Sequence, residues 1–376
     1  MGTEININNE MLIWAVDRAG FNLPDFFEKM PKLEKWLSGE KRPTLKQLEA
    51  FSKKVYLPFG YLFLQEPPKE KLPIPFFRTN SNEPEKLDVN VYDTIILMQQ
   101  RQDWLRDYLT KNHFEDLDFV GSYKDSTNVA EIVSDIRNTL SLQENWANNF
   151  KTWEEALVHL TERIEDIGII TAFNGVVENN THRKLSVDKC RGFVLVDKKA
   201  PFMFVNNADS KSAQMFTIVH ELAHIWTGIS AGFDFRKLQP ADNPTEILCD
   251  KVAAEFLVPQ KAFMEIWDKN PNIEKMARYF KVSPIVISRR AMDIGVISKT
   301  NFFEFYNSYI GNEFHKKRTN KPGGNFYATT RKRLGLTFAN HIKSAVKSGQ
   351  LLYRDAYKLT SMKGDTFNKF FSEHLK

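Results

Sequence analysis

The stretch from His220 to His224, which reads His-Glu-Leu-Ala-His, constrains this chain more than any other segment. On an α-helix, residues four apart lie one above the other, so His220 and His224 can offer two imidazole nitrogens to one metal ion. Glu221 then lies beside that face, where it can take a proton from a water that the metal holds. The pattern predicts a zinc site on a helix. The alternative is an ordinary amphipathic helix that happens to carry two histidines.

The flanking sequence supports a helix. Asp209 or Ser210 can cap its start, and Gly228 can end it. A hydrolytic zinc site also needs a third protein ligand, and a second helix is expected to begin near Pro244.

On this second helix, Glu246 and Asp250 are four apart and share a face. Glu246 is the candidate third ligand. Asp250 can accept the free ring N–H of a ligand histidine and so fix its tautomer. We therefore predict that His220, His224 and Glu246 hold the metal, with Asp250 supporting them.

These two segments resemble the ImmA/IrrE family of metallopeptidases. Residues 214–224 (QMFTIVHELAH) and 246–259 (EILCDKVAAEFLVP) are similar to the HExxH helix of that family and to the helix that follows it. The resemblance implies one Zn2+ per chain, with Glu221 as the catalytic base. It also implies cleavage of a protein substrate, typically a helix-turn-helix repressor of a phage, mobile element or stress regulon.

Periodicity and composition indicate an α+β, mainly helical fold. We expect a zincin-like catalytic domain with a small β-sheet beside the HExxH helix, because short β-rich runs at 169–173, 192–197 and 202–206 precede that helix. Helical domains flank it. The predicted parts are a helical domain at 1–65, a linker and connecting helix at 66–112, the metallopeptidase domain at 113–270, a helix-turn-helix-like pair at 271–300 and a basic helical region at 301–376.

The N-terminal part resembles the helix-turn-helix domain of phage repressors. Residues 36–45 (WLSGEKRPTL) are similar to the segment after the recognition helix. Only five residues separate Met30 from Trp36, too few for the usual turn and recognition helix. Since base-reading side chains belong on that helix, the module is compatible with weak DNA binding and equally with a structural or substrate-docking role.

The two cysteines, Cys190 and Cys249, make no disulfide framework, which is typical of a reducing compartment. The first ten residues are polar and acidic, unlike a secretory signal, and no apolar run is long enough to cross a bilayer. We expect a cytoplasmic protein with no membrane partner. Cys190 precedes a predicted strand, and its thiolate could fill the open zinc position as a latency ligand. The alternative is an inert strand-end cysteine.

The C-terminal region is positively charged: residues 300–376 contain fourteen Lys and Arg but only five Asp and Glu. This cluster predicts contacts with single- or double-stranded DNA. A solvated basic loop is an equally compatible reading. The candidate contact residues are Lys316, Lys317, Arg318, Lys321, Arg331, Lys332 and Arg333.

Together these patterns favour a zinc metalloendopeptidase of the gluzincin type that cleaves a partner protein. The alternative is a DNA-binding transcriptional regulator or antitoxin-like protein with a mainly structural metal site. A structural zinc site has no need of Glu221 and usually closes its fourth position with protein, which favours the enzyme. His182, Arg183 and Tyr279 are possible oxyanion-stabilising residues, and the sequence does not rank them.

Overall fold

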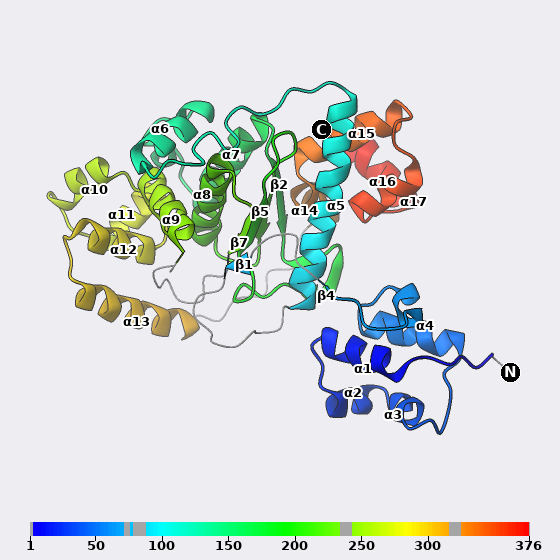
Figure 1. The fold of residues 1–376 in the computed structure, drawn as a ribbon. Helices are drawn as coiled ribbons and strands as arrows, with labels where there is room; N and C mark the ends of the chain where they lie inside the picture. The colour runs from blue at the N-terminus through cyan, green and yellow to red at the C-terminus, as the bar shows by residue number, and fades with distance from the viewer. Residues whose placement is uncertain (1–2, 71–75, 78–87, 234–242, 316–324, 376) are drawn as a thin grey trace. The chain divides into compact units, whose positions relative to one another are not determined.

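The computed structural model describes residues 3–70, 76–77, 88–233, 243–315 and 325–375. The chain divides into two compact units: Met1–Pro73 with Pro84–Asp93, and Ile74–Glu83 with Thr94–Lys376. Among the residues just given, no helix is both long enough and apolar enough to span a bilayer. Helices dominate and one small sheet lies among them, which confirms the predicted α+β class (Figure 1).

The first unit is a bundle of short helices. Leu12, Phe26, Trp36 and Phe51 are buried at its centre. The third helix has only six residues. DNA binding by this module stays a prediction. The elements are α1 (Asn9–Arg18), α2 (Leu23–Lys29), α3 (Lys32–Leu37), α4 (Leu45–Lys54) and η1 (Phe59–Phe63).

A five-stranded sheet forms the centre of the second unit, in the order β1-β7-β5-β6-β2. β2 is parallel to β6 and β1 is parallel to β7, while β5 is antiparallel to both of its neighbours. A separate hairpin joins β3 to β4. The strands are β1 (Phe76–Phe77), β2 (Ile170–Asn174), β3 (Val176–Val177), β4 (Asn180–Lys184), β5 (Gly192–Leu195), β6 (Phe202–Asn206) and β7 (Ala231–Phe233).

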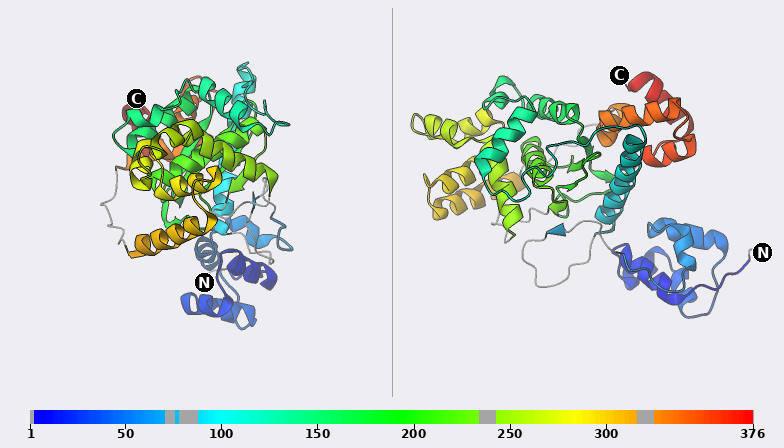
Figure 2. Two further views of the ribbon diagram at one scale, coloured as in Figure 1. Left: turned by 90° about the vertical axis from the view of Figure 1, so that its left-hand side faces the viewer. Right: turned by 45° about the horizontal axis from the view of Figure 1, so that its top comes forward.

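Helices cover both faces of this sheet (Figures 1 and 2). Val194, Met203 and Val205 point to one face and join the core formed with the HExxH helix. Side chains alternate along a strand, so Phe202 points to the opposite face, where its ring contacts Phe338. The second unit contains α5 (Val89–Lys111, from Thr94 onward), α6 (Val129–Thr139), η2 (Trp146–Asn149), α7 (Trp153–Asp166), α8 (Lys211–Thr227), α9 (Pro244–Leu257), α10 (Gln260–Trp267), α11 (Ile273–Phe280), α12 (Pro284–Ile294), α13 (Lys299–His315), α14 (Phe326–Leu334), α15 (Leu336–Lys347), α16 (Tyr353–Thr360), α17 (Gly364–Lys369) and η3 (Phe370–His374).

The C-terminal helices α14 and α15 pack against β2, the strand at one end of the sheet. Gly335, between α14 and α15, has a φ of 76°, and a Cβ there would lie 2.6 Å from the carbonyl oxygen of Thr171. Only glycine accepts both the backbone angle and this approach. Since Gly335 has no side chain to cap α15, Glu165 of α7 accepts hydrogen bonds from the backbone N–H groups of Leu336 (3.0 Å) and Thr337 (3.3 Å).

Replacing Glu165 with Ala is expected to lower the free energy of unfolding by about 1–3 kcal/mol, because first-turn N–H groups of α15 would lose their partner in a partly buried place. Chemical denaturation would measure the loss. Glu162→Ala is the matched control, since Glu162 lies on the same helix but is exposed. Equal stability of the two variants would contradict the capping role of Glu165.

Candidate active site

The HExxH segment lies on α8. The side-chain oxygen of Ser210 accepts a hydrogen bond from the backbone N–H of Ala213 and caps the start, and Gly228 ends the helix in the left-handed conformation. Both residues do what the sequence predicts. From Thr217 to Thr227 every side chain is buried. The polar groups of His220, Glu221 and His224 must therefore find their partners inside the protein.

The second helix, α9, supplies those partners. Glu246 Oε2 lies 3.1 Å from His220 Nε2, and Glu246 Oε1 lies 3.2 Å from His224 Nε2. On the other side of the first ring, Asp250 Oδ1 lies 3.0 Å from His220 Nδ1. The structure thus brings together the two histidines and the two carboxylates that the sequence predicts, from two helices that are neighbours in the core.

The three predicted ligands form a compact set of donor atoms. One ligand atom from each of His220, His224 and Glu246 lies within 4.8 Å of the others, and all three residues are buried. The two histidine Nε2 atoms are only 3.2 Å apart. Glu246 Oε1 lies near His224 Nε2 but does not accept a hydrogen bond from it. This buried oxygen has no hydrogen-bond partner among the described residues. Converging imidazole nitrogens and a buried carboxylate fit a divalent cation such as zinc.

The pKa shifts show how strongly these side chains interact. Burial alone would lower the pKa of His220, but its hydrogen bonds to Asp250 and Glu246 outweigh burial and raise the pKa to about 10. Burial would raise the pKa of Glu246, but its close contacts with the two histidines lower it to about 2. Burial lowers the pKa of His224. Without a metal, the His220 ring is therefore protonated. A cation bound between His220, His224 and Glu246 would displace this proton.

Glu221 differs from its neighbours because its carboxylate has no hydrogen-bond partner among the described residues. Both oxygens are buried and unsatisfied. Burial raises the pKa of Glu221 to about 8, with His220 opposing the shift. A nearby cation would lower this pKa and favour the ionised form. A buried carboxylate without a structural bond, beside a set of metal ligands, is suited to proton transfer.

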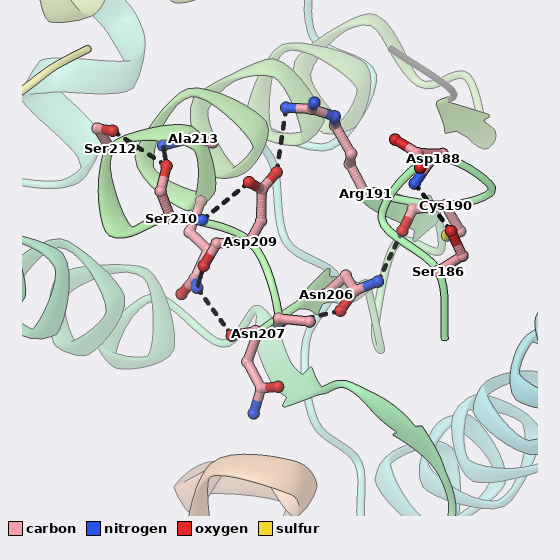
Figure 3. Close-up of polar contacts among 12 residues, drawn as sticks. Ser186, Asp188, Cys190, Arg191, Asn206, Asn207, Asp209, Ser210, Ser212 and Ala213 are labelled. Carbon is pink, nitrogen blue, oxygen red and sulfur yellow. Dashed lines mark hydrogen bonds and ion pairs between the residues drawn. The ribbon is translucent and has the colours of Figure 1, made fainter. Parts of the chain in front are cut away.

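Cys190 lies outside the set of ligand atoms. It is buried in the loop before β5, and its Sγ lies 3.8 Å from the carbonyl oxygen of Gly192 (Figure 3). In the described part of the chain, the group that could hold a metal contains only His220, His224 and Glu246. The latency role of Cys190 stays a prediction.

Three predicted nucleic-acid contacts lie within the described residues. Arg331 and Lys332 are exposed on α14, and Lys332 Nζ is 3.8 Å from Glu154 Oε1. Arg333 is partly buried and donates a hydrogen bond to Asn179 Oδ1. Arg333 thus has a structural bond within the second unit. Lys316, Lys317, Arg318 and Lys321 lie outside the described residues.

The possible oxyanion-stabilising residues lie on different elements. His182 is exposed and Arg183 is half-buried on β4, whereas Tyr279 of α11 is partly buried against the core. Gly192 and Asn206 were not predicted from the sequence. Gly192 leaves room for β5 to lie against Thr217 of α8, and the side chain of Asn206 donates a hydrogen bond to the carbonyl oxygen of Cys190, just before β5. A glycine inside a strand run is the only signal that pointed to this approach.

Two buried histidines from one helix and a buried carboxylate from the next form a candidate metal-binding site beside the small sheet. Residues 168–292 match the family model of the IrrE N-terminal-like domain, peptidase family M78. This match supports a protease of the ImmA/IrrE type, a metal-dependent class. Residues 334–373 match a domain of unknown function, DUF8813. No curated protein matches the chain.

Proposed function

We propose that this protein is a zinc-dependent endopeptidase of the gluzincin type that cleaves a partner protein. His220, His224 and Glu246 would hold one zinc ion, and Glu221 would act as the base. The observation that carries the proposal is the buried, unpartnered carboxylate of Glu221 beside three converging ligand atoms. A structural metal site would have no use for this carboxylate.

Each side chain has a defined task in this mechanism. Asp250 accepts the Nδ1–H of His220, which fixes the tautomer and turns the Nε2 lone pair toward the metal position. When bound, zinc would polarise the scissile carbonyl and make a water more acidic. Glu221 would accept a proton from that water and pass it to the leaving amine. Its buried position keeps bulk water away from the transfer.

The proposed substrate is a helix-turn-helix transcriptional repressor, whose cleavage would derepress a phage, mobile-element, stress or defence regulon. Two features support this choice. The peptidase domain matches the ImmA/IrrE type, and the first unit resembles a repressor domain with a shortened third helix. Such a module could dock a repressor without competing for its DNA site.

The proposal predicts that zinc binds more weakly as the pH falls. The pKa of His220 is raised to about 10, so its ring carries a proton throughout the neutral range, and zinc must displace that proton. Between pH 8 and pH 6 we expect the Kd for zinc to rise at least about tenfold for each unit of pH, because His220 releases a proton when zinc binds and Glu221, whose pKa a cation lowers, can release a second. Competition with a chromogenic chelator at several pH values measures this slope. A Kd independent of pH would contradict the proton count.

A cleavage assay tests the function itself. The purified protein, loaded with zinc, is incubated with the repressor encoded beside it, and products are identified by intact-mass spectrometry. Cleavage at one or a few sites, lost on adding a chelator, is expected. The reactions are repeated with single-stranded DNA and under oxidising conditions, because nucleic acid or the Cys190 thiol could gate activity. Zinc binding without cleavage in every condition would argue for the DNA-binding regulator instead.

A further inference from the structure

β5 lies directly on α8 at Gly192. A Cβ added to this glycine would lie 2.4 Å from Thr217 Cγ2, 2.9 Å from the carbonyl oxygen of Phe204 and 3.4 Å from Glu221 Oε1. Real Cβ atoms essentially never approach other heavy atoms as closely as the first two distances. Thr217 and Glu221 are four apart on α8 and so share the face that meets the strand. A larger residue would force the strand and this face of the helix apart.

The residues just before β5 are fastened to the start of α8 (Figure 3). Arg191 Nη1 lies 3.0 Å from Asp209 Oδ2, and Asp209 directly precedes the helix cap Ser210. The side-chain amide of Asn206 donates a hydrogen bond to the carbonyl oxygen of Cys190 at 2.9 Å. The ion pair links the beginning of β5 to the start of the helix that carries the HExxH segment, and the Asn206 hydrogen bond links the loop before β5 to the end of β6.

We propose that Gly192 is a positioning residue for Glu221, and that the bonds of Arg191 and Asn206 hold it in place. This inference rests on the proposed peptidase function. The carboxylate of Glu221 has no hydrogen bond to fix its orientation, so packing must do so. The backbone of β5 at Gly192 is the surface against which its Oε1 lies. Because residue 192 has no side chain, its backbone determines the position of the Glu221 carboxylate relative to the metal ligands.

Gly192→Ala tests this inference through kinetics and metal binding together. We expect kcat to fall about 100-fold, because displacing a catalytic group by about 1 Å costs that much. KM and the zinc Kd should change less than about threefold, since no atom of the three metal ligands is among the three atoms nearest the added Cβ. Gly60→Ala is the matched control, because a Cβ at Gly60 meets nothing within 4 Å. Unchanged kcat in Gly192→Ala overturns the inference.

A second substitution separates positioning from general damage to the fold. Serine at residue 217 lacks the methyl group that a Cβ at residue 192 would strike, but keeps the hydroxyl group. The double variant Gly192→Ala/Thr217→Ser should recover part of the lost kcat, with the contact to Phe204 still limiting it. If Gly192→Ala instead loses zinc and stability, and the second substitution recovers nothing, the role of Gly192 is merely structural.

A readout without catalysis distinguishes this inference from the proposed function. In protein labelled with 13C at glutamate carboxyl groups, the Glu221 signal is assigned by its loss in Glu221→Gln. It should shift in Gly192→Ala and return toward its original position in the double variant. If this happens while the wild-type protein cleaves nothing, the peptidase function fails and the positioning role stands. If cleavage is seen but the signal does not move, the positioning role fails.

Discussion

Replacing Glu221 with Gln is expected to lower kcat/KM for substrate cleavage by about 10²- to 10⁴-fold, the usual contribution of a positioned general base. The amide is nearly the same size as the carboxylate but cannot accept the proton. Zinc affinity should stay close to that of the wild type, because Glu221 is not among the three converging ligands. Initial rates from the cleavage assay, with zinc content measured on the same samples, give both quantities.

The stability of this variant is informative as well. Glu221 is fully buried, and burial raises its pKa to about 8, so the ionised form is costly inside the fold. We expect Glu221→Gln to be at least as stable as the wild type when both lack zinc. A folded variant that retains activity would contradict the role of Glu221 as the base. A variant less stable than the wild type would contradict the expected cost of burying this carboxylate.

Zinc is expected to stabilise the second unit by about 4 kcal/mol when the free ion is a thousandfold above its Kd. The ligands come from α8 and α9, and a cation between them links these two buried helices. A strong chelator should therefore lower Tm. His224→Ala should abolish the response to zinc, since it removes one of the three ligands.

His182→Ala is the control for this measurement, because His182 is exposed on β4. It should keep the full response to zinc. Thermal unfolding at several free zinc concentrations measures each curve. If His224→Ala were stabilised by zinc as strongly as the control, the metal would lie elsewhere in the protein.

The metal ligands were predictable because they follow helical periodicity. His220 with His224, and Glu246 with Asp250, each lie four apart, and on a helix that interval alone brings side chains to one face. The sequence could not show that the two helices are neighbours. Only the family resemblance supplied that expectation, and the 3.0 Å contact between His220 and Asp250 agrees with it.

Features set by three-dimensional contact were not predictable. β1 and β7 have two and three residues, too few to show alternation, so these two strands at one end of the sheet were not predicted. The role of Gly192 depends on the distance to a helix that starts nineteen residues later. Arg333 looked like one of many basic residues, yet its guanidinium is bonded to Asn179, far away in sequence.

The attachment of the C-terminal helices to β2 affects how the chain can be shortened. β2 is an end strand of the sheet, and an end strand offers unpaired N–H and C=O groups to any other chain. Gly335 lies on the backbone of Thr171, and Glu165 binds the start of α15. The boundaries of the two matched families, at 292 and 334, are therefore not boundaries of folding. A chain cut after the peptidase match is expected to expose β2 and to self-associate more readily than the full chain.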